Sequence, residues 1–173
     1  MSIQNLASLL VVGESTGTIL LESVDDFRCA IDSMTAQSRR SIKLFTQEMD
    51  HEFYDRDAFI EAASLACRSH RNCTMSILLK DANKAAKLGH RLADLQKRVP
   101  SLVQIRSLPM EYADMNDEFI IVDEIAMVKR FALGYMRGHC EFRSIPDAVK
   151  FSRQFNEIWE RSLPCQELRR LSI

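Results

Sequence analysis

The sequence predicts an α/β protein with a mixed, mostly parallel central sheet and helices on both faces. Three observations lead to this fold class. Short apolar runs alternate along the chain with longer segments whose apolar residues recur at helical spacing, which is typical of strands joined by helices. Two further strand-like runs follow each other closely late in the chain and indicate an added antiparallel part. The apolar fraction of 46% is enough to form a buried core.

Composition limits the classes of partner that we expect. The chain has 173 residues, with 23 Lys and Arg against 24 Asp and Glu, so its net charge is −1. This balance argues against a nucleic-acid partner, because nucleic-acid-binding domains carry a basic surface. Two groups of neighbouring cations nevertheless leave a local basic face open: Arg39, Arg40 and Lys43, and Lys80, Lys84 and Lys87.

The cysteines and the apolar runs indicate a cytoplasmic protein. Five cysteines, an odd number without a CxxC pair, are typical of free thiols in a reducing compartment. The first twelve residues lack the basic start of a signal peptide, and no run of about 18 apolar residues could span a bilayer. We therefore expect no membrane span. We also expect no cofactor and no bound metal.

One domain over residues 1–173 is expected, because no linker, repeat or low-complexity segment interrupts the chain. Two β-prone runs around Gly13 and Gly17 predict an N-terminal hairpin over residues 8–21. A core follows over residues 23–162, and a short tail over 163–173. The glycines lack the spacing of a phosphate-binding loop, so a plain turn is expected between the two strands.

The core begins with a helix, since Ser23 is a good N-cap and Asp25 and Asp26 complement the helix dipole. The last helix is predicted to begin at Ser144, with Pro146 in its first turn. The expected order between these points is helix 23–38, strand 42–45, loop 46–56, helix 57–69, strand 74–79, helix 82–98, strand 102–108, loop 109–115, and strands 118–122, 126–132 and 139–142.

The strand over 118–122 carries the most specific pattern. Four apolar residues run without a break from Phe119 to Val122, which favours a central strand buried on both faces. Asn116 and Glu118 lie at its start and Asp123 at its end. Strand alternation would send Asp117 and Glu118 to opposite faces of the sheet.

These residues resemble the HxKxxxxD motif of the phospholipase D superfamily. The run from Phe119 to Asp123 fixes the register, so the family's histidine falls on Asn116 and its lysine on Glu118. The preceding helices and strands are in a similar order, and Phe155 and Trp159 are similar to the family's FxxxW helix end. The resemblance covers roughly residues 23–162, and the chain looks most like small single-copy bacterial members of unknown function.

The resemblance implies a phosphoryl-transfer scaffold without its chemistry. In the family, histidines attack phosphorus and protonate the leaving group, and lysines bind the phosphoryl oxygens. Asn116 has no basic lone pair, and Glu118 places an anion where a cation is needed. The family's Gly-Ser-x-Asn element is also missing, because Lys129-Arg130-Phe131 stands where it would begin. We expect a catalytically inactive binding or regulatory module, with a diverged phosphodiesterase or nuclease-type hydrolase as the alternative.

Three residues are candidates for ligand binding: His51, Glu141 and Arg130. His51 lies in the loop after the first core strand, at the sheet edge where ligand sites gather in α/β proteins. The acidic residues around 111–124 could hold a divalent cation, but a solvated face is the simpler interpretation, with Asp123 capping a turn or pairing with Lys129 or Arg130.

Two cysteine–histidine groups are weaker candidates. Cys67, His70 and Cys73 could form a nucleophilic pair, and His139 with Cys140 could supply two zinc ligands. No orienting acid and no second ligand pair accompany them, so packing is the simpler interpretation of both.

The resemblance also implies a homodimer, because the family builds its cleft from two copies of the fold. A two-fold axis near the strand that runs from Asn116 to Asp123 would bring two Glu118 and two Asp123 side chains together. These carboxylates need either cationic partners, such as Arg130, Arg137 or Arg143, or a bound cation. The ligand itself, a small molecule or another protein, does not follow from the sequence.

Overall fold

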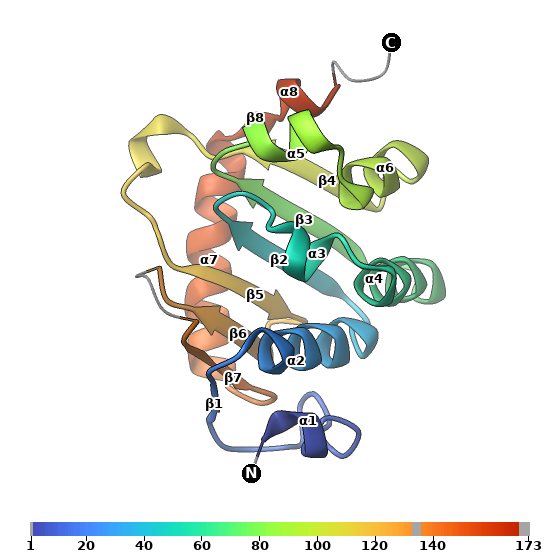
Figure 1. Ribbon diagram of the computed structural model, residues 1–173, viewed down its shortest axis with the longest axis vertical. Helices are drawn as coiled ribbons and strands as arrows, with labels where there is room; N and C mark the ends of the chain where they lie inside the picture. The colour runs from blue at the N-terminus through green and yellow to red at the C-terminus, as the bar shows by residue number, and fades with distance from the viewer. Residues whose placement is uncertain (1, 133–135, 170–173) are drawn as a thin grey trace.

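The computed structural model describes residues 2–132 and 136–169, and its centre is an eight-stranded sheet in the order β1-β7-β6-β5-β2-β3-β4-β8 (Figure 1). The strands are β1 (Ile19–Leu21), β2 (Ser41–Thr46), β3 (Thr74–Leu79), β4 (Val103–Ser107), β5 (Glu118–Val122), β6 (Ala126–Arg130), β7 (Gly138–Glu141) and β8 (Leu163–Pro164).

The sheet is mixed, as predicted, but less of it is parallel than expected. Among the described residues, β2–β3 and β3–β4 pair in parallel, and the other five pairings are antiparallel. The parallel pairings join strands that are connected by helices, and the antiparallel pairings include β5 with β6, which a tight turn connects. Strand β5 joins the two parts, because it pairs with β6 on one side and with β2 on the other.

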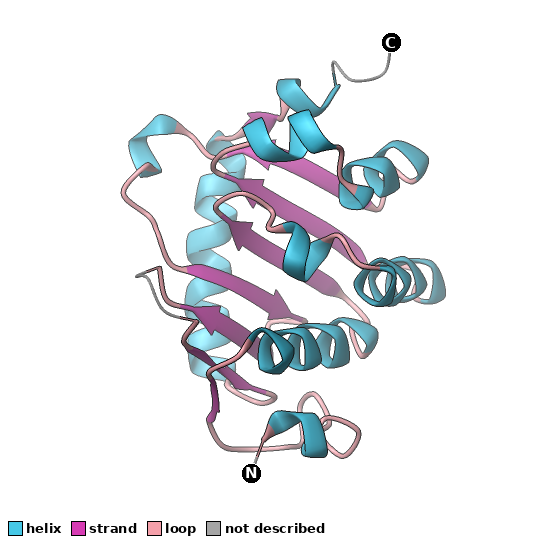
Figure 2. Cartoon of the chain, in the orientation of Figure 1, coloured by secondary structure: helices cyan, strands magenta, loops and turns pink. Residues whose placement is uncertain are grey.

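Helices cover both faces of the sheet, as Figure 2 shows. The longest helix, α7 (Ile145–Arg161), lies alone behind the sheet in this view, and most of the other helices lie in front. These other helices are α1 (Ile3–Leu6), α2 (Val24–Ala36), α3 (His51–Tyr54), α4 (Asp57–Ser69), α5 (Asn83–Leu88), α6 (Arg91–Arg98) and α8 (Gln166–Arg169), with a 3₁₀ turn, η1 (Met110–Tyr112).

Two cores follow from this layering. The larger core packs α2 and α4 against alternate strand residues, such as Leu44 of β2 and Ile120 of β5. The smaller core packs α7 against the residues between them, such as Phe45 and Phe119. Because β5 is buried on both faces, all five of its residues are buried, which explains its unbroken apolar sequence.

Most core elements lie where the sequence predicts them. Helix α4 and strand β3 match the expected 57–69 and 74–79 residue for residue. Ser23 is the N-cap of α2, and its side chain accepts a hydrogen bond from the Asp26 backbone N–H. Ser144 precedes α7 as expected, although its side chain makes no capping bond to the backbone.

The predicted N-terminal hairpin over residues 8–21 is wrong. Residues 3–6 form α1, residues 8–12 form no strand, and β1 pairs antiparallel with β7, more than a hundred residues away. The Gln37 side chain fixes the intervening loop, because it accepts from the Val12 N–H and donates to the Leu10 carbonyl. Local β-propensity identified β1 but could not identify its partner.

Three smaller expectations also need correction. The single helix expected over 82–98 is two helices, because Gly89 adopts a φ of 76° and ends α5 before His90 caps α6. The loop expected over 46–56 contains the short helix α3. The C-terminal tail contributes the edge strand β8 and helix α8, and its residues 170–173 lie outside the described part. No helix in the described ranges is long and apolar enough to cross a membrane.

Candidate functional site

A pocket of about 950 Å³ opens at the start of β5, where the sequence places its degenerate motif. Its lining combines polar and charged side chains with three phenylalanines. Its lining residues are Gln47, Asp114, Met115, Asn116, Asp117, Glu118, Phe119, Lys129, Arg130, Phe131, Ala132, Met136, Phe151 and Gln154. Strands β5 and β6, the loop before β5 and helix α7 therefore all contribute to one site.

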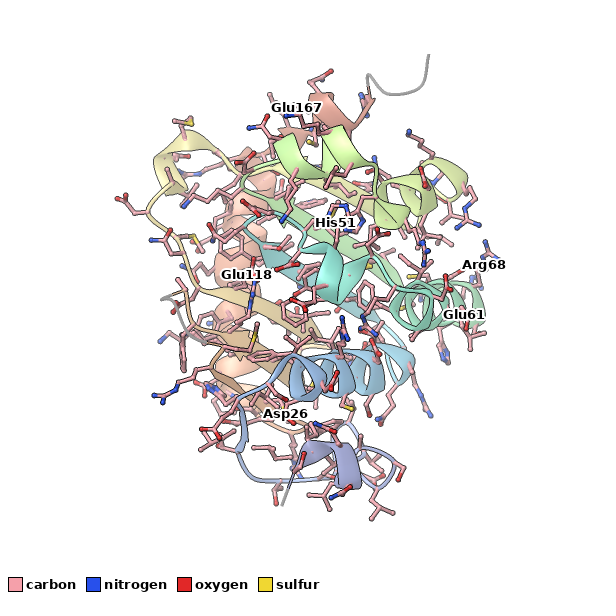
Figure 3. The ribbon with its side chains drawn as sticks, viewed as in Figure 1. Asp26, His51, Glu61, Arg68, Glu118 and Glu167 are labelled. Carbon is pink, nitrogen blue, oxygen red and sulfur yellow. The ribbon has the colours of Figure 1, made fainter. Side chains whose placement is uncertain are left out.

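Glu118 is the most constrained residue of this pocket, with 3% of its surface exposed. Its Oε1 accepts hydrogen bonds from the Thr46 hydroxyl (3.0 Å) and the Gln47 backbone N–H (2.6 Å). Its Oε2 accepts from Nε of Arg130 (2.9 Å) and, at close range, from Nη2 of the same guanidinium. Both carboxylate oxygens thus accept from donors in β6, in β2 or directly after β2, the two neighbouring strands of β5. Figure 3 shows where Glu118 lies in the molecule.

Arg130 is held in place as firmly as Glu118. Its guanidinium lies 4.8 Å from the centre of the Phe53 ring and 3.9 Å from a carboxylate oxygen of Asp50. Burial lowers the pKa of Arg130, but the adjacent Glu118 carboxylate outweighs this effect and raises it overall. Burial also raises the pKa of the neighbouring Tyr54 phenol, and Glu118 raises it further. The result is a buried ion pair with its polar atoms satisfied inside the protein.

Asn116 lies on the exposed rim of the pocket, two residues before Glu118. Its side-chain oxygen accepts a hydrogen bond from Nζ of Lys80 (2.9 Å), which also donates to the Met115 carbonyl (3.2 Å). The Gln47 side chain donates to the carbonyls of Met115 and Asn116. Lys80 follows β3 and Gln47 follows β2, so both parallel strands anchor the loop that precedes β5.

Lys129 supplies the second cation of the pocket, on the opposite face of the sheet from Glu118. Its Nζ lies 3.4 Å from Asp117 and within 5.5 Å of the centres of the Phe131 and Phe151 rings. Asp117 also accepts a hydrogen bond from the Ala132 N–H. The predicted divergence of Asp117 and Glu118 is therefore confirmed, because the two carboxylates bind partners on different faces.

Asp123, the third motif position, lies at the far end of β5, away from the pocket. Its carboxylate accepts hydrogen bonds from the Ser38 hydroxyl and from the backbone N–H groups of Arg39, Arg40 and Ser41, at 2.7 to 3.2 Å. It thus fixes the loop between α2 and β2. The expectation that it caps a turn is confirmed, and the expected pairing with Lys129 or Arg130 is wrong.

Comparison with known proteins gives a family and a fold. A family model described as a domain of unknown function, DUF7931, matches residues 23–171. The chain belongs to the DUF7931 family. No curated protein sequence matches it at a significant level.

Solved structures give the DUF7931 chain a phospholipase D-like fold. NucT from Helicobacter pylori is similar with a TM-score of 0.67 and 14% identity, covering 87% of this chain and 100% of NucT. Nuc from Salmonella typhimurium, a phospholipase D family member, gives 0.63 and 12%, covering 87% and 99%. At these identities the likeness shows the fold alone.

Another similar structure is larger than the DUF7931 chain. TrmBL2, an archaeal chromatin protein with a novel mode of DNA binding, gives a TM-score of 0.63 at 16% identity, over 94% of this chain. The chain spans only 59% of the TrmBL2 chain.

Two of the candidate binding residues lie outside the pocket of the DUF7931 chain. His51 begins α3, where its Nε2 lies 2.8 Å from the Gly89 carbonyl and its ring packs 4.7 Å from the His90 ring. Glu141, on β7, accepts a hydrogen bond from the Thr18 hydroxyl. Arg130 is the candidate that the structure places in the pocket, together with Asn116 and Glu118.

The cysteine groups have structural surroundings. All five cysteines are free, and Cys67 and Cys73 are both buried. A hydrogen bond from Cys67 lowers the pKa of the Cys73 thiol, whose sulfur also lies 3.6 Å from the Ser38 hydroxyl. Among the described residues, no group of three or more His, Cys, Asp or Glu side chains is arranged to hold a metal ion.

Sequence reasoning missed Lys80, Gln47, Phe151 and Gln154 as site residues. Lys80 was visible as a cation directly after a strand, which is a position that favours ligand sites. Its place beside Asn116 depends on β5 lying next to β2, and no local pattern specifies that order. Phe151 and Gln154 approach the pocket from α7, which follows the motif by about thirty residues.

Proposed function

We propose that this protein is a catalytically inactive phospholipase D-like protein that acts as a binding or regulatory module through its β5 pocket. The observation that carries the proposal is the Glu118–Arg130 ion pair. The resemblance places a phosphate-binding lysine at position 118, where this chain has a buried carboxylate. Arg130 is paired with that carboxylate. If Arg130 bound a phosphoryl oxygen instead, Glu118 would be left buried and unpaired.

Asn116 supports the same proposal. The resemblance assigns a nucleophilic histidine to this position, and an amide side chain has no lone pair of comparable basicity. Its oxygen already accepts a hydrogen bond from Lys80. The pocket therefore keeps the location of a phosphoryl-transfer site, while the two groups that would do the chemistry are replaced by groups bonded to their neighbours.

The pocket suits a ligand that is partly polar and partly apolar. Its lining offers the polar groups of Gln47, Asn116 and Asp114 and the rings of Phe119, Phe131 and Phe151. Specific binding pockets commonly combine apolar walls with a few polar groups that fix orientation. A small molecule or a segment of a partner protein with an apolar group beside a hydrogen-bonding group fits this lining.

A diverged phosphodiesterase or nuclease-type hydrolase is the second candidate. The observation that favours it is the likeness to Nuc, a phospholipase D family member, over nearly the whole of both chains. Lys80 and Lys129 are the cations that such an activity would have to use, because Arg130 is paired with Glu118. His51 is not among the residues that line the pocket, and its Nε2 lies 2.8 Å from the Gly89 carbonyl.

An activity panel separates the two candidates. Bis-p-nitrophenyl phosphate, single-stranded DNA and phosphatidylcholine are each incubated with the protein, with and without Mg²⁺, Mn²⁺ and Zn²⁺. The proposed function predicts no turnover above a buffer control. Turnover that is lost in Lys129→Ala, but kept in the exposed control variant Lys87→Ala on α5, would establish a hydrolase and refute the inactive module.

We also propose that the module is a homodimer, with the pockets of two copies near a two-fold axis. The resemblance implies such an assembly, and the exposed Phe131 beside the pocket supplies apolar surface for it. The internal neutralisation of Glu118 by Arg130 removes the repulsion that two carboxylates near the axis would otherwise create.

We further propose a cytoplasmic location, which is consistent with five free thiols.

A further inference from the structure

A group of cations lies at the end of the sheet where the parallel strands begin, opposite the pocket. Three loops reach this end, each joining a helix to the start of a parallel strand: α2 to β2, α4 to β3 and α6 to β4. The cations at or next to these loops are Arg39, Arg40, Arg68, Arg71, Lys97 and Arg98, and all six side chains are exposed. We refer to these six residues as the basic edge.

The register of the sheet brings the three loops together. Ser41 of β2 is level with Thr74 of β3, and Met75 is level with Val103 of β4. The Arg40 carbonyl accepts a hydrogen bond from the Thr74 N–H, so the first two loops are in direct contact. Neighbouring strands lie about 4.8 Å apart, so the three strand starts span roughly 10 Å before the reach of the side chains is added.

The basic edge is not neutralised by the rest of the described chain. None of its six side chains takes part in an ion pair within residues 2–132 and 136–169. The two carboxylates of the adjacent β5–β6 turn bind other groups directly, since Asp123 accepts from backbone N–H groups and Glu124 binds Lys43 and Ser152. Glu124 also attracts Arg40 at longer range, without forming an ion pair with it. The positive charge therefore faces solvent.

Helix electrostatics explain only half of the basic edge. Arg68, Lys97 and Arg98 lie in the last turns of α4 and α6, where cations complement the helix dipole. Arg39, Arg40 and Arg71 lie beyond the helix ends, in the loops themselves. Stabilisation of the helix dipoles therefore does not explain these three arginines.

The chemistry of the basic edge selects the class of partner. Five of its six cations are arginines, whose planar guanidinium groups match phosphate oxygens in pairs. A membrane-binding surface would add several apolar side chains for insertion. On the helices and loops of the basic edge, Leu65 is the one large apolar side chain that is exposed among the described residues.

We propose that the basic edge binds the phosphate backbone of a nucleic acid, without reading its sequence. This surface is separate from the pocket: Figure 3 shows Arg68 at the right-hand rim of the molecule and Glu118 left of its centre. The net charge of −1 does not exclude this surface, because a net charge carries no information on how the charged side chains are distributed.

The test measures binding of the full chain to a labelled 20-base-pair DNA duplex by fluorescence anisotropy, from 50 to 200 mM KCl. Each phosphate contact adds about −0.9 to the slope of log K against log salt. Three to six contacts thus predict a slope between about −3 and −5. In Arg68→Ala/Arg71→Ala the slope falls in magnitude by about 2, and affinity at 50 mM falls at least about tenfold.

Matched variants make the result decisive. Lys84→Ala/Lys87→Ala removes the same charge from α5, at the other edge of the sheet, and should change affinity by less than about twofold. Equal losses in the two double variants, or no salt-dependent binding at 50 mM KCl, would overturn the proposal. A loss in Lys129→Ala would place the nucleic acid in the pocket instead. Preferential binding to phosphatidylserine vesicles that DNA does not displace would assign the surface to a membrane.

Discussion

At the residue scale, the buried Glu118–Arg130 ion pair determines how the protein responds to a substitution at position 118. A buried carboxylate that accepts hydrogen bonds from a hydroxyl, a backbone N–H and a guanidinium is satisfied by its own chain. Such pairs add little over an apolar pair of similar shape, but breaking one partner is costly because the other charge stays buried. Glu118 is therefore difficult to change alone.

Glu118→Gln should lower the free energy of unfolding by about 3 to 5 kcal/mol, because it leaves the Arg130 guanidinium buried without its counter-charge. Urea denaturation measures the change. Asp117→Asn is the matched control, since its partner Lys129 lies on a solvent-accessible face, and it should cost less than about 1 kcal/mol. Adding Arg130→Met to Glu118→Gln should recover part of the loss, and strict additivity of the two substitutions would contradict the pairing.

His90 gives the protein an acid-sensitive element. Burial lowers its pKa from 6.5 to about 4, and its ring donates to the Met49 carbonyl while accepting from the Leu92 N–H. The unfolded chain binds a proton at this site below about pH 6.5, and the folded chain does so only near pH 4. Protonation between these values therefore favours the unfolded state.

The free energy of unfolding should fall as the pH drops from 6.5 to 4, by up to about 3 kcal/mol from this residue. Thermal melting followed by circular dichroism across this range measures the slope. His90→Gln should flatten the profile between pH 4 and 6.5, because glutamine does not titrate. An unchanged slope in that variant would assign the acid sensitivity to the carboxylates instead.

At the element scale, the Asp123 carboxylate connects two turns that are distant in sequence. Asp123 and Glu124 both have a positive φ, near 57°, and form the tight turn between β5 and β6. From there the carboxylate binds three consecutive backbone N–H groups between α2 and β2. Since β2 and β5 are neighbours in the sheet, this contact also sets where their pairing ends.

Asp123→Ala should cost about 2 to 4 kcal/mol of stability, because several partly buried donors lose a charged acceptor at once. Asp123→Asn should cost less, since asparagine tolerates positive φ and retains one acceptor oxygen. Urea denaturation of both variants separates turn conformation from charge. If the two variants lost the same stability, the carboxylate's charge would not be the source of the effect.

The element scale also shows where sequence reasoning succeeds and fails. Helix α4 and strand β3 were predicted to the residue, because periodicity and their boundaries are local signals. The partner of β1 was not, because Ile19 pairs with Cys140, and nothing near residue 19 specifies that contact. The site follows the same division: Asn116 and Glu118 were located by motif, while Lys80 joins them only through the strand order.

At the scale of the whole molecule, the pocket and the basic edge occupy the two ends of the same strands. The pocket lies where β5 begins, and the basic edge lies where β2, β3 and β4 begin. Because β5 runs antiparallel to β2, the pocket and the basic edge lie at opposite ends of the strands. A ligand in the pocket and a polymer on the basic edge could be held at the same time without competing.

The proposed dimer has a direct test. Size-exclusion chromatography with light scattering should give twice the 19.9 kDa mass of the chain at micromolar concentration. Phe131→Glu should shift the protein towards the monomer, because it places a charge in the apolar part of the proposed interface, while Leu65→Glu on the distant helix α4 should leave the dimer intact. A monomer in the unmodified protein would remove the dimer proposal.

The two outer strands restrict how copies of this protein can associate. Strand β1 has three residues and β8 has two, and one of the two is Pro164, which has no backbone N–H to offer. Short edges with a proline are poor templates for strand addition, so the open sheet is protected from edge-to-edge aggregation and fibril growth. We therefore expect copies of this chain to associate through side-chain contacts rather than by strand addition.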